Sequence, residues 1–327
     1  MNRLEVAGVV SLDSFLPPSI ELALHEEAPV NVNADAFFES CFAMPHRPVP
    51  AEELRQGVVL AREHLPSQQL IEAAWHVWRL CGNGRTLQPI IFIEGVMSSG
   101  KSTLGEILAN RMDGMFRREG FAFNVGLRQF YPSLREIANW RGDGAGLQRL
   151  YQRIQPVQAE TQVAFANATL SRVVTGVIDA QFSPTVVDVL FSNAVFELVH
   201  RRLHLASQEH FEQYAQASRL RWSVMPPLSN SVIVYNAVCS PEEIMRRMAG
   251  RWGEDAARDF ERDMPLGYVE HLIRASFELA RFLQECAAFS PNVFFITVDA
   301  ENVDYSSTNP AREELADALV RVINGVL

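Results

Sequence analysis

Residues 95–103 have the residue types and the spacing of a phosphate-binding loop. They read Gly-Val-Met-Ser-Ser-Gly-Lys-Ser-Thr, which fits the pattern G-x-x-x-x-G-K-[ST]. In such a loop the backbone N–H groups and the positive end of the next helix surround an anion. We expect Lys101 to reach the β- and γ-phosphates of a nucleoside triphosphate such as ATP, and the Ser102 hydroxyl to ligate Mg²⁺. The residues predicted to contact the triphosphate are Gly95, Ser98, Ser99, Gly100, Lys101, Ser102 and Thr103.

The segments on either side of this loop provide the context that the motif requires. The apolar run 89–93 is typical of a buried strand, and the stretch 103–111 places Leu104, Ile107 and Leu108 at helical spacing. A strand, a glycine-containing loop and a helix in this order distinguish the motif from a chance match in a surface loop. The sequence therefore predicts that the chain binds a nucleoside triphosphate or descends from a protein that did.

Phosphoryl transfer also requires an acid that holds Mg²⁺. We expect this acid to be Asp179, because the apolar run 173–179 is predicted to be a strand and ligand-binding residues lie at the carboxyl ends of such strands. The alternative interpretation is that Asp179 caps a helix or lies in a turn, since aspartate is common in both positions.

Three arginines are candidates for contact with the transferring phosphate. Arg247 and Arg251 lie four residues apart on a predicted helix that begins near residue 240, and Arg258 follows in a charged loop. The planar guanidinium donates hydrogen bonds in pairs to phosphate and stays ionised. The alternative is that this helix face is only solvated.

The elements that must position these side chains alternate along the chain. Apolar runs predicted to be strands occur at 89–93, 121–125, 173–179, 231–238 and 293–299, with helical patterns between them. Pro156 is expected in the first turn of a helix that extends to about residue 173. This alternation predicts an α/β fold of the P-loop NTPase type, with a parallel sheet of about five strands and helices on both faces.

The first 85 residues are predicted to form an N-terminal extension, separate from a domain at 86–327. Prolines punctuate residues 1–50, and helical spacing follows at 52–80. Turn-forming residues at 82–84 then separate this partly helical extension from the domain that carries the phosphate-binding loop.

Composition narrows the class of protein. Of the 327 residues 48% are hydrophobic, enough for a packed core, and the formal net charge of −10 disfavours nucleic acid as a partner. No apolar run reaches the roughly 18 residues of a membrane span, so no membrane association is expected. The four cysteines form no C-x-x-C pair and no secretion signal is recognisable, which predicts a cytoplasmic or nucleocytoplasmic protein that is not secreted.

Four segments, in the same order, resemble the deoxynucleoside kinase family, which includes the herpesvirus-type thymidine kinases. They are the loop at 95–103, Leu-Ser-Arg at 170–172, CSPEEIMRRMAGR at 239–251 and MPLGYVEHL at 264–272. The resemblance covers about residues 88–325. It implies that ATP, Mg²⁺ and a nucleoside bind, and that Arg247, Arg251 and Arg258 form a lid. It also implies that residues 299–305, which end in Tyr305, form the loop on the adenine side.

The sequence departs from the family pattern at three places. Family members carry E-R-S or D-R-H after the strand that is expected to end at Asp179, whereas this chain has Asp-Ala-Gln. The family's general base is a glutamate after its second strand, and the nearest acid here is Glu136, which becomes the candidate base. The family's base-binding glutamine has its nearest match in Gln162, about one helical turn away, and Trp140 is a second candidate for contact with the nucleoside.

Three functions are compatible with these observations. The first is ATP-dependent phosphorylation of a thymidine-like deoxynucleoside at its 5′-hydroxyl, in nucleotide salvage, in which positioning and charge neutralisation carry most of the catalysis. The second is a nucleotide-binding or scaffold protein with a kinase-like fold, which the missing glutamate and arginine favour. The third is a phosphotransferase that acts on another small molecule. We leave open which nucleoside is bound and whether the chain forms a homodimer.

Overall fold

The computed structural model describes residues 8–15, 29–42, 68–82, 87–119, 126–223, 230–252, 261–288, 292–303, 305 and 310–327. Within them, six strands form one sheet in the order β1-β6-β5-β2-β4-β3. Their bounds are β1 Val9–Val10, β2 Ile90–Gly95, β3 Met115–Arg117, β4 Thr185–Asp188, β5 Ser231–Ala237 and β6 Val293–Asp299. All neighbouring strands are parallel except β1, which pairs antiparallel to β6.

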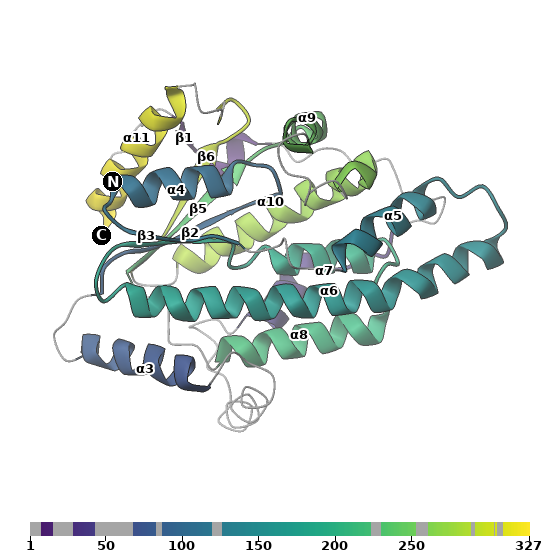
Figure 1. Cartoon of the computed structure of the whole chain (residues 1–327), viewed down its shortest axis with the longest axis horizontal. Helices are drawn as coiled ribbons and strands as arrows, with labels where there is room; N and C mark the ends of the chain where they lie inside the picture. The colour runs from purple at the N-terminus through teal and green to yellow at the C-terminus, as the bar shows by residue number, and fades with distance from the viewer. Residues whose placement is uncertain are drawn as a thin grey trace.

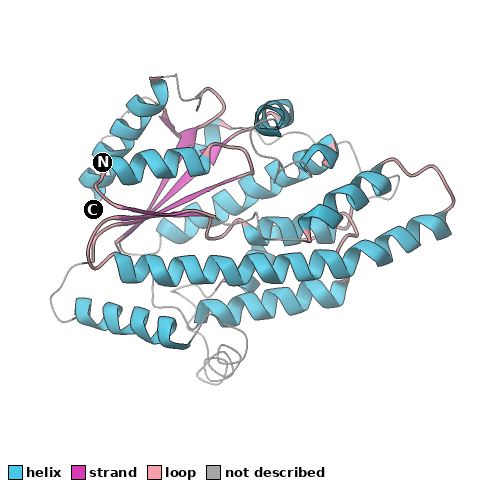
Figure 2. Ribbon diagram, in the orientation of Figure 1, coloured by secondary structure: helices cyan, strands magenta, loops and turns pink. Residues whose placement is uncertain are grey.

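Helices cover both faces of this sheet (Figures 1 and 2). Their bounds are α1 Ala34–Cys41, α3 Gln68–Gly82, α4 Lys101–Arg111, α5 Leu127–Ala138, α6 Gly144–Asp179, α7 Asn193–Arg202, α8 Gln208–Ser223, α9 Pro241–Trp252, α10 Leu266–Ala288 and α11 Ala311–Val326. On one face α4 and α11 enclose a smaller core with the strands. On the other face α6, α7 and α10 enclose a larger core. The predicted α/β fold, a parallel sheet with helices on both faces, is therefore confirmed.

Strands β2 and β5 are central and buried along their whole length. Apolar side chains therefore point to both faces, which explains why these strands appear in the sequence as continuous apolar runs rather than as alternating patterns. Together with β6, they were the strands that the sequence predicted at 89–93, 231–238 and 293–299.

The predicted strand at 173–179 is wrong, because these residues form the last two turns of α6. Helix α6 extends over 36 residues and runs along most of the molecule (Figure 1). Pro156 lies inside this helix and not in its first turn, which Asp143 caps by accepting a hydrogen bond from the Gly146 N–H. The strand between β2 and β3 is instead β4, which begins six residues after α6 ends. The predicted strand at 121–125 lies outside the described residues, and β3 precedes it.

Residues of the expected N-terminal extension contact the rest of the chain. Strand β1 adds to the sheet beside β6, and α1 packs on α8 and α10. Phe38 of α1 is completely buried in the larger core. The expected boundary near residue 85 lies outside the described residues. Among the helices that the structure describes, none has the length and apolarity that crossing a membrane requires.

Candidate active site

The phosphate-binding loop joins β2 to α4, as predicted. Gly95 and Gly100 both have positive φ angles, 136° and 88°, which side chains disfavour. A Cβ on Gly95 would lie 2.6 Å from the Asn236 carbonyl oxygen, and a Cβ on Gly100 would lie 2.5 Å from the Tyr305 ring. The loop is thus packed closely between β5 and the segment after β6, and only glycine fits at these two positions.

Lys101 is the first residue of α4, and its side chain is almost completely buried. Its Nζ donates a hydrogen bond to the Val96 carbonyl at 2.8 Å, which holds the ammonium group within the loop. Burial lowers the pKa of Lys101, and the nearby carboxylates of Asp188, Glu119 and Glu94 act in the opposite direction. The ammonium group therefore lies where the loop would hold a phosphate.

Asp188 ends β4, and its carboxylate contacts the phosphate-binding loop. Its Oδ2 accepts a hydrogen bond of 2.5 Å from the Ser102 hydroxyl. Asp179, the residue expected in this place, instead ends α6 and accepts a 2.5 Å hydrogen bond from Arg117 Nε. The structure therefore places Asp188, and not Asp179, at the end of the strand next to the loop.

The Ser102–Asp188 pair fits a Mg²⁺ ion of the kind that the family implies. Asp188 is buried, and its Oδ1 has no hydrogen-bond partner among the described residues. A hydroxyl and a carboxylate supply the hard oxygen ligands that Mg²⁺ prefers, with water and phosphate completing its coordination. Ser102 and Asp188 are therefore the residues that would hold the ion.

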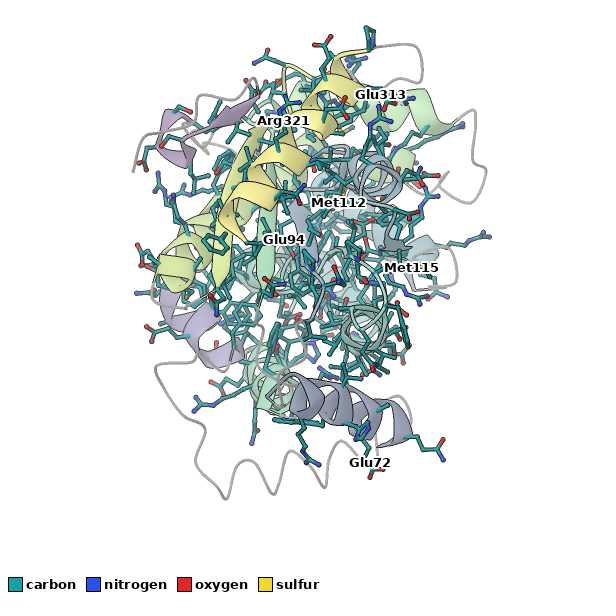
Figure 3. All side chains as sticks on the ribbon, turned by 90° about the vertical axis from the view of Figure 1, so that its left-hand side faces the viewer. Glu72, Glu94, Met112, Met115, Glu313 and Arg321 are labelled. Atoms are coloured by element: carbon teal, nitrogen blue, oxygen red, sulfur yellow. The ribbon has the colours of Figure 1, made fainter. Side chains whose placement is uncertain are left out.

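Glu94, the residue before Gly95, fixes the loop that follows β4. It is fully buried and lies in the interior in Figure 3, whereas Glu72 and Glu313 lie at the surface. Its Oε1 accepts hydrogen bonds from the Leu190 and Phe191 N–H groups at 2.5 and 2.9 Å, and its Oε2 accepts one from the Ser192 hydroxyl. Burial raises the pKa of Glu94, although these donors lower it. This carboxyl group thus sets the position of the segment that leads from Asp188 into α7.

Glu119 is a carboxylate of the cleft that the sequence pattern did not predict. It follows β3 by two residues and lines the cleft beside the phosphate-binding loop. Burial raises the pKa of Glu119, and Asp188 raises it further, whereas Arg172 and Lys101 lower it.

Glu136, the expected base, lies elsewhere. It is on α5, its side chain is 47% exposed, and it forms an ion pair with Arg153. It does not line the cleft in the part of the chain that the structure describes. The structure therefore does not bring it to Lys101, because α5 points this side chain toward α6 at the surface.

Helix α9 presents its two candidate arginines to different parts of the site. Arg251 lines the cleft, where its Nη2 donates to the Ser98 hydroxyl and lies 3.2 Å from Glu261 Oε2. Arg247 instead donates to the Ala300 carbonyl at 2.8 Å and lies over the Tyr305 ring, 5.9 Å from its centroid. Arg251 is thus directed to the phosphate-binding loop and Arg247 to the segment after β6. Arg258 lies outside the described residues.

Tyr305 packs against the phosphate-binding loop at Gly100. Its expected place on the adenine side stays a prediction. Asn236, near the end of β5, donates to the Ser99 carbonyl at 3.1 Å and lies 3.4 Å from the Tyr305 hydroxyl. The loop, β5 and the segment after β6 are therefore joined by one side chain.

The cleft extends from the phosphate-binding loop into a partly aromatic chamber, and its volume is about 310 Å³. Leu127 and Tyr131 of α5, Phe165 of α6 and Phe196 of α7 line this part. The predicted nucleoside contacts do not: Gln162 is buried within α6, and Trp140 lies beyond α5, where its Nε1 donates to the Asp143 carbonyl. The residue that α6 directs into the cleft is Phe165, nearly one helical turn after Gln162.

The chain also resembles known proteins. The family model for deoxynucleoside kinase matches residues 91–324. A comparison with curated protein sequences finds no match. Among solved structures, the deoxyadenosine kinase from M. mycoides with the products dCMP and a flexible dCDP bound is 18% identical with a TM-score of 0.51, and the match covers 73% of this chain and 100% of that chain. The same enzyme with bound dATP is 18% identical with a TM-score of 0.51, covering 71% and 98%. With bound dCTP it is 18% identical with a TM-score of 0.50, covering 72% and 99%.

At this identity the solved structures establish the fold, and the family model establishes the relationship. The model spans more than half of the chain and includes the phosphate-binding loop from β2 onward, β4 with Asp188, and α9 with its arginines. The chain belongs to the deoxynucleoside kinase family.

Proposed function

We propose that the chain transfers the γ-phosphoryl group of ATP to the 5′-hydroxyl of a deoxynucleoside. The observation that carries this proposal is that Glu119, a carboxylate in one cleft with Lys101 and Ser102, lies between the phosphate-binding loop and an aromatic chamber. A triphosphate on the loop and a nucleoside in the chamber would meet at this carboxylate.

Each residue of the cleft has a role in this reaction that follows from its chemistry. The backbone N–H groups of the loop and the Lys101 ammonium would bind the β- and γ-phosphates, and Arg251 would stabilise charge on the transferring group. Ser102 and Asp188 would hold Mg²⁺, which when bound neutralises phosphate charge. Glu119 would accept the proton of the attacking hydroxyl.

The aromatic chamber supports a nucleoside as the acceptor. Phe165 and Phe196 offer flat apolar faces, on which bases stack with little dependence on their identity. We propose a thymidine-like base from the resemblance of the sequence motifs. Deoxyadenosine and deoxycytidine are the comparison substrates, because the solved relatives carry dATP, dCTP and dCMP.

The test is release of ADP by the purified protein with Mg-ATP and each of the four deoxynucleosides. We expect turnover with at least one of them and the highest kcat/KM with thymidine. A higher kcat/KM for deoxyadenosine or deoxycytidine would change the proposed nucleobase preference and would still support the proposed reaction. Binding of ATP without turnover of any deoxynucleoside would favour the nucleotide-binding alternative instead.

Two variants separate the candidate bases. Glu119→Gln removes the proton acceptor in the cleft, and we expect kcat to fall by about 100- to 10,000-fold. Glu136→Gln changes the carboxylate that pairs with Arg153 on the surface. A large loss of kcat in Glu136→Gln, with a normal kcat in Glu119→Gln, would indicate that Glu136 of α5 is the general base.

A further inference from the structure

Arg172 of α6 lies close to the cleft, although it was not among the candidate site residues. Its side chain is only 10% exposed, and its Nη2 lies 3.8 Å from Glu119 Oε1. The same nitrogen donates to the Thr169 hydroxyl at 2.9 Å and points toward the Val189 carbonyl at 3.5 Å. Within the described residues, Glu119 is the one carboxylate within ion-pair distance of this guanidinium.

We propose that Arg172 is a positioning residue, which holds the Glu119 carboxylate toward the acceptor hydroxyl. This inference rests on the proposed function, in which Glu119 is the general base. A guanidinium that is mostly removed from water is stabilised by an opposite charge, and among the described residues that charge is the Glu119 carboxylate in the cleft.

The position of Arg172 is fixed from two helices. Thr169 Oγ1 accepts hydrogen bonds both from Arg172 and from Asn193 Nδ2, the latter at 2.6 Å. Asn193 begins α7 and lines the cleft. The Arg172 guanidinium is thus connected through Thr169 to Asn193, which lines the cleft. Its orientation toward Glu119 is therefore set by the packing of α6 and α7.

The charges around Glu119 explain why a cation is needed there. The groups that face Glu119 come from five elements, namely Glu94 of β2, Lys101 of α4, Tyr131 of α5, Arg172 of α6 and Asp188 of β4. Burial and the two carboxylates favour the protonated form of Glu119, and only the two cations oppose this. Lys101 would be engaged by phosphate during the reaction, so Arg172 is the cation that remains beside the Glu119 carboxylate.

A double-mutant cycle tests the proposal, with variants Arg172→Met, Glu119→Gln and the combination. We expect Arg172→Met to lower kcat by about 10- to 100-fold, part of the full general-base effect, and to change the KM for the nucleoside less than about threefold. Arg172 acts through Glu119, so adding Arg172→Met to Glu119→Gln should cause no further loss of kcat. Arg172→Lys keeps the charge and should recover part of the loss.

The matched control is Arg202→Met. Arg202 is a similarly buried arginine, 13% exposed, that pairs with Glu278 of α10 at 2.7 Å, and neither residue lines the cleft. Its replacement should leave kcat unchanged. Two results would show that Arg172 contacts the substrate itself: multiplicative losses of kcat in the double variant, or a large rise in KM whose size depends on the nucleobase of the substrate. Either result would overturn the proposal and would leave the proposed kinase activity unaffected.

A second readout does not require turnover. The Glu119 carboxyl carbon, identified by its absence in Glu119→Gln, is titrated by ¹³C NMR in metal-free protein. We expect its titration midpoint to move to higher pH in Arg172→Met and to stay in place in Arg202→Met. If no deoxynucleoside is phosphorylated, the proposed function fails and this shift still supports the ion pair; an unchanged midpoint in Arg172→Met would refute the inference.

Discussion

At the scale of single residues, the site depends on charges that lie close together and are largely removed from water. Asp188 lies near both Lys101 and Glu119 and affects the pKa of each, and burial opposes the charged form of both Lys101 and Glu119. A phosphoryl-transfer site gains from this arrangement, because preorganised charges act more strongly where water is excluded. Replacing one charge should therefore affect binding or turnover without unfolding the protein.

We predict that Lys101→Met weakens Mg-ATP binding by about 10- to 100-fold, the value of a charge-assisted hydrogen bond. Methionine keeps most of the buried aliphatic chain, so the fold should remain intact. Isothermal titration calorimetry measures the affinity, and thermal unfolding of the same sample reports the fold. ATP affinity equal to that of the wild type would contradict the assignment of the loop.

At the scale of elements, helix α9 connects two loops of the site. Its last turn brings Arg251 to Ser98 of the phosphate-binding loop, and its middle brings Arg247 to the carbonyl groups after β6. The Glu243 carboxylate accepts hydrogen bonds from Arg246 and Arg247, which lower its pKa to about 2. One helix thus contacts both the phosphate-binding loop and the segment that carries Tyr305.

We therefore expect different kinetic effects from the two arginines. Arg251→Ala should lower kcat by about 10- to 100-fold with a smaller change in nucleoside KM, because it removes a charge that the transition state needs most. Arg247→Ala should mainly raise the KM for ATP, because the loop with Tyr305 loses its anchor. Steady-state kinetics with both substrates varied distinguish these outcomes, and a change confined to KM in Arg251→Ala would contradict its role.

The interface of α6 and α7 contains a buried acid whose effect depends on pH. Burial raises the pKa of Glu197 to about 8 from a usual value of 4.5, although Gln158 donates a 2.6 Å hydrogen bond to it. Between these two values the folded state binds more protons than the unfolded state. The free energy of unfolding should therefore fall as pH rises through this window, by at most about 1.4 kcal/mol per pH unit.

Glu197→Gln should remove this part of the pH dependence. Urea denaturation at about pH 5 and about pH 8 should show a smaller loss of stability in the variant than in the wild type. Burial lowers the pKa of His200 and His210, so these two act in the opposite direction at lower pH, and they do so in both proteins. An equal loss in both proteins would mean that Glu197 is not the titrating group.

The elements that the sequence predicted correctly are those with strong local signals. The strand, loop and helix at residues 90–111, together with β5, β6 and α9, have long apolar runs, capping residues or a recognisable motif. Strands β3 and β4 have only three and four residues, and the side chains that matter are Glu119, two residues after β3, and Asp188, the last residue of β4. Their signal was hidden by the longer apolar run 173–179, which is helical.

The apolar residues of the run 173–179 have helical spacing. Val173, Val174 and Val177 are buried, and their spacing of one, three and four positions is that of a helix face. Treating the run as the end of a helix makes residues 185–188 the next strand, and then Asp188 takes the place expected for Asp179. The position of Arg172 beside Glu119 depends on packing between α6 and the segment after β3, which no local pattern contains.

At the scale of the whole molecule, N-terminal residues complete the larger core. Phe38 is completely buried, with its ring centroid 5.6 Å from that of Phe282 on α10, and α1 also packs on α8. The domain expected at 86–327 therefore shares its core with residues that precede it. Stability should depend on α1 although α1 contributes no side chain to the cleft among the residues that line it.

We predict that Phe38→Ala lowers the free energy of unfolding by about 3–5 kcal/mol, the usual result of removing a buried phenylalanine. The matched control is Phe182→Ala, because Phe182 is 82% exposed and its removal should change stability by less than about 0.5 kcal/mol. Chemical denaturation of both variants provides the comparison. Equal stabilities would mean that α1 does not pack as described.

The burial of Lys101 has one more consequence, because it is the only lysine among the 327 residues. The other residues counted as Lys or Arg are all arginines, and amine-directed reagents do not acylate arginine. Apart from the α-amino group, such reagents have one target, and it lies inside the phosphate-binding loop behind the Val96 carbonyl. Peptide mass mapping after acylation should therefore find a single internal adduct, formed slowly and suppressed by Mg-ATP, so that a general protein label becomes a specific probe of whether this loop is occupied.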